Sequence, residues 1–413
     1  MYRCTLTPVF LLAVLMCSTA LAQDRSGTFG ISFTGFVKTD MMYDSRQTVS
    51  AREGHFLLYP AHEWLDRHEE DINAHPSFNM LSIQTRLRGN ISGPDAFGAS
   101  TSGAIEAEFF GTVDNDINGF RLRHAYVAAD WGSTSVLVGQ TWHPMFVAEV
   151  FPGVVSFNTG VPFQPFSRNP QLRLMQEIGA LRMIAVAATQ RDFQSFGPDA
   201  SGRSVASSAF MRNSVLPNLH LQAQYANKGY IFGAGVDYKE LTPRLVTSEN
   251  VRTDTRVGSL AGLAYARVDA APLTLKAQAV VGENLADLLM FGGYAVTSVD
   301  QTTGAETYTT LGGYSLWGEI IHGRDVELAV FAGYAGNLGA GEEFIGSPYA
   351  RAANIDHVYR ISPRVQWTSG KMRISTELEY TTAAYGTMNT DGSVRDAKTV
   401  ENLRLLAAVW YFF

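Results

Sequence analysis

Arginine side chains at alternating positions are the residues of this sequence best suited to chemistry, and the chemistry they suit is anion binding. In the stretch FRLRHAYV, residues 120–127, Arg121 and Arg123 alternate with Phe120 and Leu122. Successive side chains of a β-strand point to opposite faces, so both guanidinium groups would share one face. A guanidinium group stays charged at any relevant pH, and its donors match a carboxylate in bidentate geometry.

The same pattern recurs along the chain and predicts one charged interior. The basic residues predicted to face it are Lys38, Arg86, Arg88, Arg121, Arg123, Arg173, Arg360, Arg364, Arg373 and Arg404. Glu106 and Glu108 are predicted to face it from a strand between two arginine-bearing strands. A ladder of basic residues is the expected filter of an anion pore. The alternative is that the arginines pair with these acids and stabilise the wall, and even then a narrow wet channel would focus the excess charge.

Catalytic and metal sites are not predicted, and neither is a cofactor. The acidic and histidine-rich stretch HEWLDRHEED, residues 62–71, could bind a divalent ion, but its histidines lack zinc-helix spacing and a solvated outer loop is the prediction. No nucleophile elbow, phosphate loop or H-E-x-x-H motif occurs. Alternation places His124 and Tyr126 on the apolar face. A lipid-acting barrel enzyme that uses His124 or His357 at the rim therefore stays open as an alternative.

The elements that must position these residues are strands. Apolar and polar residues alternate in segment after segment, and helical periodicity is hard to find. Sixteen strands are predicted, at 31–43, 78–91, 102–113, 120–131, 134–141, 171–178, 181–190, 218–226, 230–239, 256–268, 272–282, 312–321, 326–335, 354–367, 371–383 and 398–412.

Three features favour a membrane barrel over a soluble β-sandwich. The strands are near ten residues long, short turns alternate with long loops, and the chain ends in the aromatic run VWYFF. The long loops are predicted at 44–77, 142–170, 191–217, 283–311 and 336–353. The fold class predicted is thus all-β, a transmembrane antiparallel β-barrel of about sixteen strands, a number that leaves an aqueous lumen.

The loop 142–170 is predicted to fold into the barrel as its third loop. It is rich in Gly, Pro and Phe and has few charges, a composition that suits packing inside a barrel. Arg168, together with Arg173, would then face the arginine wall across the constriction. The alternative is a surface loop that contributes to a subunit contact.

The amino terminus predicts export. Arg3, the apolar run from Val9 to Met16 and the small residues before Gln23 form a signal peptide, residues 1–22, which leaves one domain at 23–413. Both cysteines, Cys4 and Cys17, lie in the signal peptide; a lipoprotein site at Cys17 is disfavoured by Met16 before it. The net charge of −7 argues against nucleic acid as a partner.

Several stretches together resemble the DcaP-like outer-membrane porins. These are GFVKTDMMYDSRQ (35–47), FRLRHAYV (120–127), VGQTWHPMF (138–146), GAGVDYKELTPR (233–244), GENLADLLMFGGYAV (282–296) and VWYFF (409–413). The resemblance implies a trimeric sixteen-stranded porin that passes small anionic solutes, dicarboxylates among them. One departure is the lack of room for the coiled-coil extension that some of these proteins carry, so barrel walls alone would hold a homotrimer.

The prediction is therefore a porin for passive diffusion of small hydrophilic solutes, anions preferred, in the outer membrane of a Gram-negative bacterium. Its expected partners are small anions, outer-membrane lipid and lipopolysaccharide, and the barrel-assembly machinery through Phe413. A non-conducting anchor or adhesin is the other alternative.

Overall fold

The computed structural model describes residues 29–111 and 114–413, and its wall is a closed antiparallel sheet. β1 pairs with β5 on one side and with the last strand, β23, on the other, which closes the barrel. The sixteen wall strands are β1 (Gly30–Asp44), β5 (Arg86–Ser92), β6 (Ser100–Phe109), β7 (Phe120–Asp130), β8 (Thr134–Trp142), β9 (Arg168–Ile178), β10 (Leu181–Ala188), β13 (Asn218–Asn227), β14 (Tyr230–Leu241), β15 (Val257–Ala270), β16 (Leu273–Glu283), β18 (Glu306–Gly323), β19 (Val326–Ala340), β21 (Ile355–Ser369), β22 (Met372–Met388) and β23 (Val394–Phe412). The predicted sixteen-stranded barrel is confirmed. The predicted signal peptide lies outside the described residues.

Short extra elements belong to the long loops at one end of the barrel, and some of them fold into the lumen. They are β2 (Thr48–Ala51), β3 (Phe56–Pro60), β4 (Ser77–Leu81), β11 (Phe196–Pro198), β12 (Ser204–Ala206), β17 (Gly292–Val299), β20 (Ile345–Arg351), α1 (Ala209–Ser214), η1 (Ile72–Ala74), η2 (Asp114–Asp116) and η3 (Ala286–Leu288). Among the described residues no helix is long and apolar enough to cross a membrane. The strand predicted at 78–91 is in fact broken into β4 and β5, and β17 and β20 extend the sheet where loops were predicted.

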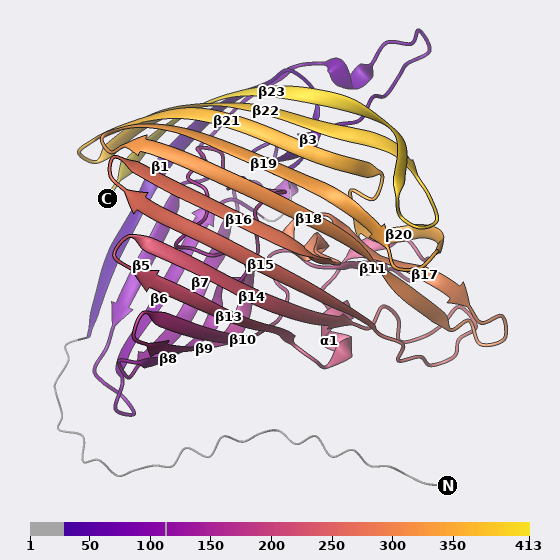
Figure 1. The fold of residues 1–413 in the computed structure, drawn as a ribbon, viewed down its shortest axis with the longest axis horizontal. Helices are drawn as coiled ribbons and strands as arrows, with labels where there is room; N and C mark the ends of the chain where they lie inside the picture. The colour runs from indigo at the N-terminus through magenta and orange to yellow at the C-terminus, as the bar shows by residue number, and fades with distance from the viewer. Residues whose placement is uncertain (1–28, 112–113) are drawn as a thin grey trace.

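The two ends of the barrel differ. Short turns and the carboxyl terminus lie at the left in Figure 1, whereas the long loops, α1, β17 and β20 lie at the right. Phe413 at the turn end exchanges two backbone hydrogen bonds with Gly35, so the last residue is tied to the first strand. The asymmetry is typical of outer-membrane barrels.

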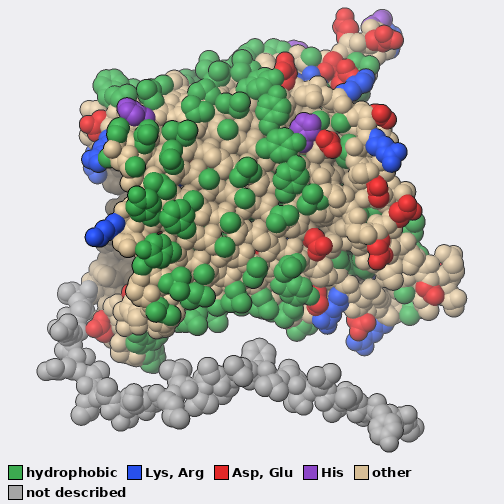
Figure 2. All heavy atoms as spheres, in the orientation of Figure 1, with side chains coloured by type: hydrophobic (Ala, Val, Ile, Leu, Met, Phe, Trp, Pro, Cys, Tyr) green, Lys and Arg blue, Asp and Glu red, His purple; other side chains and the backbone are tan. Residues whose placement is uncertain are grey.

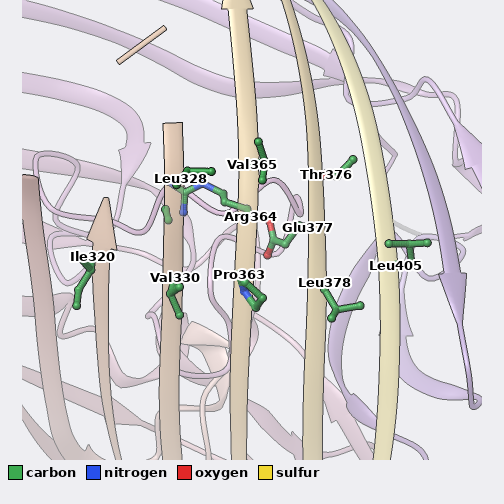
Figure 3. Close-up of a pocket in the computed structure, with 11 residues that line it drawn as sticks. Ile320, Leu328, Val330, Pro363, Arg364, Val365, Thr376, Glu377, Leu378 and Leu405 are labelled. Atoms are coloured by element: carbon green, nitrogen blue, oxygen red, sulfur yellow. The ribbon is translucent and has the colours of Figure 1, made fainter. Parts of the chain in front are cut away.

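The outer surface carries an apolar band and the inner surface carries charge. Hydrophobic side chains cover the face seen in Figure 2, and charged side chains gather mainly toward the loop end. Figure 3 shows the alternation at close range: Val365 and Leu378 are exposed on the outer face, whereas their neighbours Arg364 and Glu377 are buried inside. The outward side chains line a shallow apolar hollow of about 460 Å³.

A β-bulge in β7 changes which residues face inward. Glu106 pairs with His124 and Ala107 with Leu122, which leaves Arg123 as the extra residue. The bulge shifts the alternation by one, so His124 is buried inside and Tyr126 bonds the inward Arg88, while Val127 is exposed outside. The predicted outward positions of His124 and Tyr126 are therefore wrong. From β8, Gln140 Nε2 donates to the bulge carbonyl of Arg123 at 3.0 Å.

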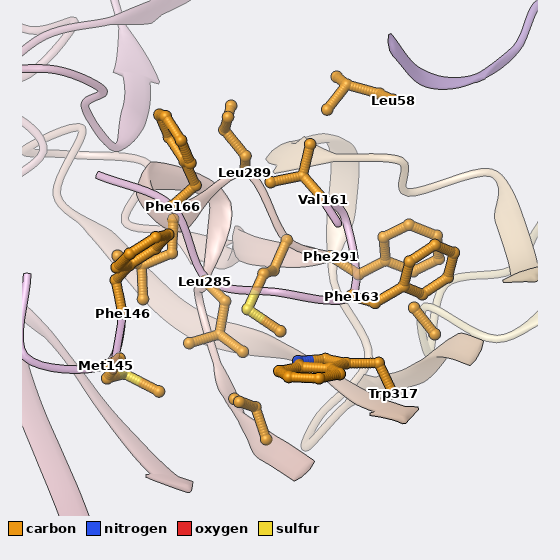
Figure 4. Close-up of a cluster of buried hydrophobic side chains, with 14 of the residues drawn as sticks. Leu58, Met145, Phe146, Val161, Phe163, Phe166, Leu285, Leu289, Phe291 and Trp317 are labelled. Atoms are coloured by element: carbon orange, nitrogen blue, oxygen red, sulfur yellow. The ribbon is translucent and has the colours of Figure 1, made fainter. Parts of the chain in front are cut away.

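The hydrophobic core lies inside the barrel. Figure 4 shows side chains of the loop between β8 and β9, here loop 3 (143–167), packed with Trp317 of the wall. Leu58 from the first loop, loop 1 (45–76), and Leu285, Leu289 and Phe291 from the segment after β16 join the same cluster. Loop 3 therefore fills part of the lumen, which confirms its predicted inward fold.

Candidate functional site

Loop 3 crosses the lumen and is bonded to the opposite wall. The N–H of Gly153 donates to both carboxylate oxygens of Glu319 on β18 at 3.0 Å. Arg360 on β21 donates to the carbonyl of Val161 at 2.9 Å, and Ser315 on β18 donates to that of Phe163 at 2.8 Å. Further donors to loop 3 carbonyls are Lys38, Lys276 and Gln278. These bonds hold the loop away from the wall formed by β5 to β9.

On that wall, five arginines share three carboxylates. The five are Arg86, Arg88, Arg121, Arg123 and Arg168, and the three are Glu106, Glu108 and Asp192. Glu106 is 2.7 Å from Arg123 Nε and 3.2 Å from Arg88 Nη1. Glu108 is 3.0 Å from Arg86 Nη2 and 3.1 Å from Arg121 Nη2, and it also binds Arg123. We call these eight residues the arginine cluster; their formal charge is positive by two.

The sequence reasoning missed Asp192, which lies in loop 4 (189–217). Its carboxylate is 2.6 Å from Arg121 Nη1 and 3.1 Å from Arg168 Nη2. Burial by itself raises the pKa of Asp192, but the guanidinium groups of Arg168, Arg121 and Arg52 lower it to about 2. Alternation gives no signal for a residue in a loop, so only the fold could reveal this carboxylate.

A cavity of about 400 Å³ lies between the arginine cluster and loop 3. Arg86, Arg88 and Arg123 line it from the cluster, and Lys38 and Arg373 line it from β1 and β22. Loop 3 closes the other side with the segment from Phe151 to Phe157. Five cations therefore surround one cavity beside Glu106, the acidic residue that lines it.

The other predicted residues face inward but differ in surroundings. Arg404 is fully buried and binds Asp44 at 2.7 Å and the loop 1 carbonyl of Gly54 at 2.8 Å. Arg360 donates to the loop 1 carbonyl of Leu58 at 3.0 Å. Loop 1 is thus bonded to both arginines, and loop 3 is bonded to Arg360 as well. Arg364 binds Glu319 and, at 2.6 Å, Glu327.

The sequence predicted that Arg168 faces the arginine wall across the constriction, and this prediction is wrong. Arg168 belongs to the arginine cluster, with its guanidinium group 4.7 Å from the Trp142 ring and 5.0 Å from the Phe166 ring. The reason is that β9 is only two strands from β7, so Arg168 lies on the same arc. Arg173, on the same strand, donates to the Trp142 carbonyl at 2.8 Å.

Aromatic side chains from four loops form a layer next to the arginine cluster. Phe110 stacks on Phe157 with ring centroids 4.1 Å apart, and Phe56 packs edge-on against Phe166 at 5.0 Å. Phe193 of loop 4 completes the layer. All but Phe193 are almost fully buried, so the layer is closely packed.

The acidic stretch 62–71 is a self-bonded part of loop 1. Asp66 accepts the N–H groups of His68 and Glu70 at 2.7 and 3.0 Å. Desolvation raises the pKa of Asp71, but the N–H of Trp64 and the guanidinium group of Arg46 outweigh it and lower the pKa. Within residues 29–111 and 114–413, no three His, Cys, Asp or Glu side chains are placed to hold a metal ion.

Comparisons with known proteins find similarity at the level of structure. No protein-family model matches the chain, and no curated protein matches it in sequence. The crystal structure of the outer membrane channel DcaP of Acinetobacter baumannii aligns with a TM-score of 0.69 and 15% identity, over 95% of this chain and 99% of that chain. OmpT, an outer membrane protein of Vibrio cholerae, aligns with a TM-score of 0.55 and 10% identity, over 95% of this chain and 100% of that one.

These likenesses extend over nearly the whole of each chain, so they concern the complete closed sheet. The chain therefore has the fold of the outer membrane channel DcaP, a closed sixteen-stranded antiparallel barrel.

Proposed function

We propose that this protein is a porin that lets small hydrophilic solutes diffuse passively across the outer membrane and that it prefers anions such as dicarboxylates. The observation that carries the proposal is the arginine cluster, in which five guanidinium groups share three carboxylates beside a cavity inside a closed barrel. An anion that enters this cavity would meet guanidinium N–H donors that the three carboxylates of the arginine cluster do not occupy.

The location of the arginines inside the channel supports an anion preference, as does their excess over the carboxylates. Low-dielectric walls around a wet channel focus the field of an excess charge. Arg88 is the member most open to solvent, with 28% of its side chain exposed, so it is the cation best placed to meet a solute. A guanidinium group binds a carboxylate through two parallel hydrogen bonds, which favours carboxylates over spherical ions, and several cations around one cavity suit a solute with two carboxylates.

The test is the reversal potential of the purified protein in a planar bilayer under a KCl gradient. A chloride-selective offset is expected, and Arg88→Ala should reduce it. Arg256→Ala is the matched control, because Arg256 is half exposed near the loop end and pairs with Glu240 outside the cavity. A cation-selective offset, or an offset that Arg88→Ala leaves unchanged, would remove the anion preference from the arginine cluster.

Two outcomes would favour the other classes of function. No conductance from folded protein would favour an anchor or adhesin, whose long loops would be the working surface. Acyl release from phospholipid by the detergent-solubilised protein would favour a lipid-acting enzyme. Neither alternative explains the excess of buried arginine beside a cavity.

A homotrimer is part of the proposal and is supported by the uneven height of the wall. β5 and β10 have 7 and 8 residues, fewer than the about 9–11 that a tilted membrane strand needs, and β6 to β9 between them have only 9 to 11. Between them the outer surface carries an apolar hollow of about 740 Å³ lined by small residues such as Gly103 and Ala125. A neighbouring subunit would shield this short wall from lipid. One OmpT structure of Vibrio cholerae is described as a trimer form.

The remaining elements of the proposal concern biogenesis. Residues 1–22 would direct export and be removed, which leaves 23–413 as one barrel domain. The aromatic carboxyl end with Phe413 would be read by the barrel-assembly machinery, and the apolar band would contact outer-membrane lipid and lipopolysaccharide. Mass spectrometry of the purified protein tests the cleavage directly.

A further inference from the structure

Loop 1 places a β-hairpin inside the barrel. β2 and β3 pair only with each other and form a two-stranded sheet separate from the wall. All five residues of β3, Phe56–Pro60, are buried. A two-stranded hairpin is at best marginally stable by itself. The position of this segment, residues 48–60 and here called the loop 1 hairpin, therefore depends on its contacts with the rest of the protein.

Those contacts combine apolar packing of Phe56, Leu58 and Tyr59 with polar contacts of a kind that water can replace. Side chains of the wall donate to three hairpin carbonyls: Arg404 to Gly54 at 2.8 Å, Arg360 to Leu58 at 3.0 Å and Tyr385 to Pro60 at 2.8 Å. At the tip, His55 Nε2 bonds Asp40 Oδ2 on β1 at 2.9 Å, and Asn79 Nδ2 donates to the carbonyl of Glu53 at 3.0 Å. Loop 3 contributes one bond that opening must break, from Asn158 Nδ2 to the carbonyl of Leu57 at 3.2 Å. No backbone ladder joins the hairpin to the barrel in the described part of the chain.

The tip of the hairpin is held in an unfavourable conformation. Arg52 and Glu53 have φ angles of 59° and 54°, in the left-handed region that residues with a Cβ adopt only at a cost. The Arg52 guanidinium group is buried near the rings of Phe110 and Phe193, at 4.8 and 5.6 Å, and beside an arginine cluster that is already positive. Burial, with the charge of Arg121, lowers the pKa of Arg52 to about 10. Strain and charge therefore oppose the inserted position, while apolar packing favours it.

The hairpin supplies part of the aromatic layer. Phe56 lies 5.4 Å from Phe157, 5.0 Å from Phe166 and 6.0 Å from Phe193 between ring centroids. His55 packs edge-on against Phe110 at 4.9 Å. Withdrawal of the hairpin would remove Phe56 and His55 from the centre of this layer and unpack the loop side of the cavity.

We propose that the loop 1 hairpin is the gate of the channel, that the structure holds it in the closed position, and that it opens by leaving the lumen as a unit while loop 3 stays bonded to the wall. This inference rests on the proposed pore function and adds its regulation. Loop 3 stays because its bonds to the wall are more numerous and include the two from Gly153 to Glu319.

Cysteine labelling tests the movement without reference to conductance. Leu57→Cys places a thiol at a hairpin residue with no exposure, and Val280→Cys places one at a buried wall position in the apolar interior. Both are made in a chain with Cys4 and Cys17 replaced by Ser. A membrane-impermeant maleimide should label the Leu57→Cys protein faster than the Val280→Cys protein. Asp40→Asn, which weakens the tie to His55, should speed labelling of Leu57→Cys alone by about tenfold.

Equal and slow labelling of both thiols, unchanged by Asp40→Asn, would overturn the gate. Single-channel recording supplies the second readout, with residues 50–57 replaced by two glycines. Loss of long closures in this variant is expected. A variant that conducts and closes as the parent does would overturn the gate and leave the pore intact. A hairpin thiol that labels fast in a protein that never conducts would instead contradict the proposed pore function.

Discussion

Arg123 shows how one residue can combine structure with electrostatics. As the extra residue of the β7 bulge it binds both Glu106 and Glu108, and it is almost fully buried. Its main contribution is to stabilise two inward carboxylates, whereas Arg88, although it binds Glu106 and Tyr126, is more exposed and can meet a solute. The two interpretations of the arginines, as a filter and as a structural wall, therefore apply to different members of the arginine cluster.

Arg123→Ala is expected to destabilise the barrel by about 3 kcal/mol, because it removes one partner from buried ion pairs. The other arginines of the cluster keep the loss toward the lower end of the usual range. The free energy of unfolding of Arg123→Lys should lie between those of the parent protein and Arg123→Ala, since an ammonium group cannot bridge two carboxylates in fork geometry. Urea unfolding of the refolded protein measures both. An unfolding free energy that matches that of Arg256→Ala would contradict this role.

At the scale of elements, loop 3 packs against β19, where a glycine without a side chain leaves space for a loop 3 phenyl ring. Phe163 lies directly over Gly333 of β19: a Cβ added there would come within 2.5 Å of the phenyl ring. The neighbouring strand offers a control in Gly318, where the nearest atom to an added Cβ is 3.8 Å away. Glycine at 333 is thus required by close approach rather than by backbone conformation.

Gly333→Val should displace Phe163 and loosen loop 3, whereas Gly318→Val should leave the loop in place. We expect a changed single-channel conductance and faster hydrogen exchange over residues 150–165 in the first variant alone. Identical conductance and exchange in the two variants would show that loop 3 does not depend on this contact.

Loop 4 is anchored through Asp192, and its pH dependence follows from the pKa of that carboxyl group. Since the pKa is lowered to about 2, the stabilising contribution is complete above the ordinary aspartate pKa and is lost only as the pH falls toward 2. Proteolysis at the exposed tip around Arg203 should therefore proceed equally slowly at pH 8 and pH 5, after correction for protease activity. The Asp192→Asn substitution should speed proteolysis of loop 4 at both pH values, because the neutral amide no longer pairs with the arginines. A parent protein already loosened at pH 5 would contradict the assignment.

For the whole molecule, the wall is tall over β18 to β23 and short over β5 to β10. The tall strands reach 18 and 19 residues in β18 and β23. They carry the apolar band of Figure 2, which is suited to lipid. The short wall bears the hollow that the proposed trimer would fill.

Gly103→Leu, in the hollow of the short wall, is expected to shift the detergent-solubilised protein from trimer to monomer, because a bulky side chain fills space that a neighbour would occupy. Gly262→Leu on β15 adds the same side chain at a position with open space, its nearest atom being 3.8 Å from an added Cβ. Mass photometry distinguishes the species. Equal trimer fractions in the two variants would place the interface elsewhere.

The sequence by itself determined the barrel. Alternation is a local property of an extended chain, so strand after strand could be placed from its own residues, and the inward arginines followed from the same rule. The inward loop 3 could also be predicted, because its composition of Gly, Pro and Phe differs from that of a solvated loop.

Only the tertiary structure decided what alternation cannot encode. The bulge at Arg123 moved His124 and Tyr126 to the inside, and no local pattern marks one extra residue in a strand. Asp192 joins the arginine cluster and Arg52 lies beside it, both from loops, where side-chain direction depends on contacts far away in sequence. The covering of Arg360 and Arg404 was decided in the same way, since both bond loop 1 carbonyls that lie far from them in sequence.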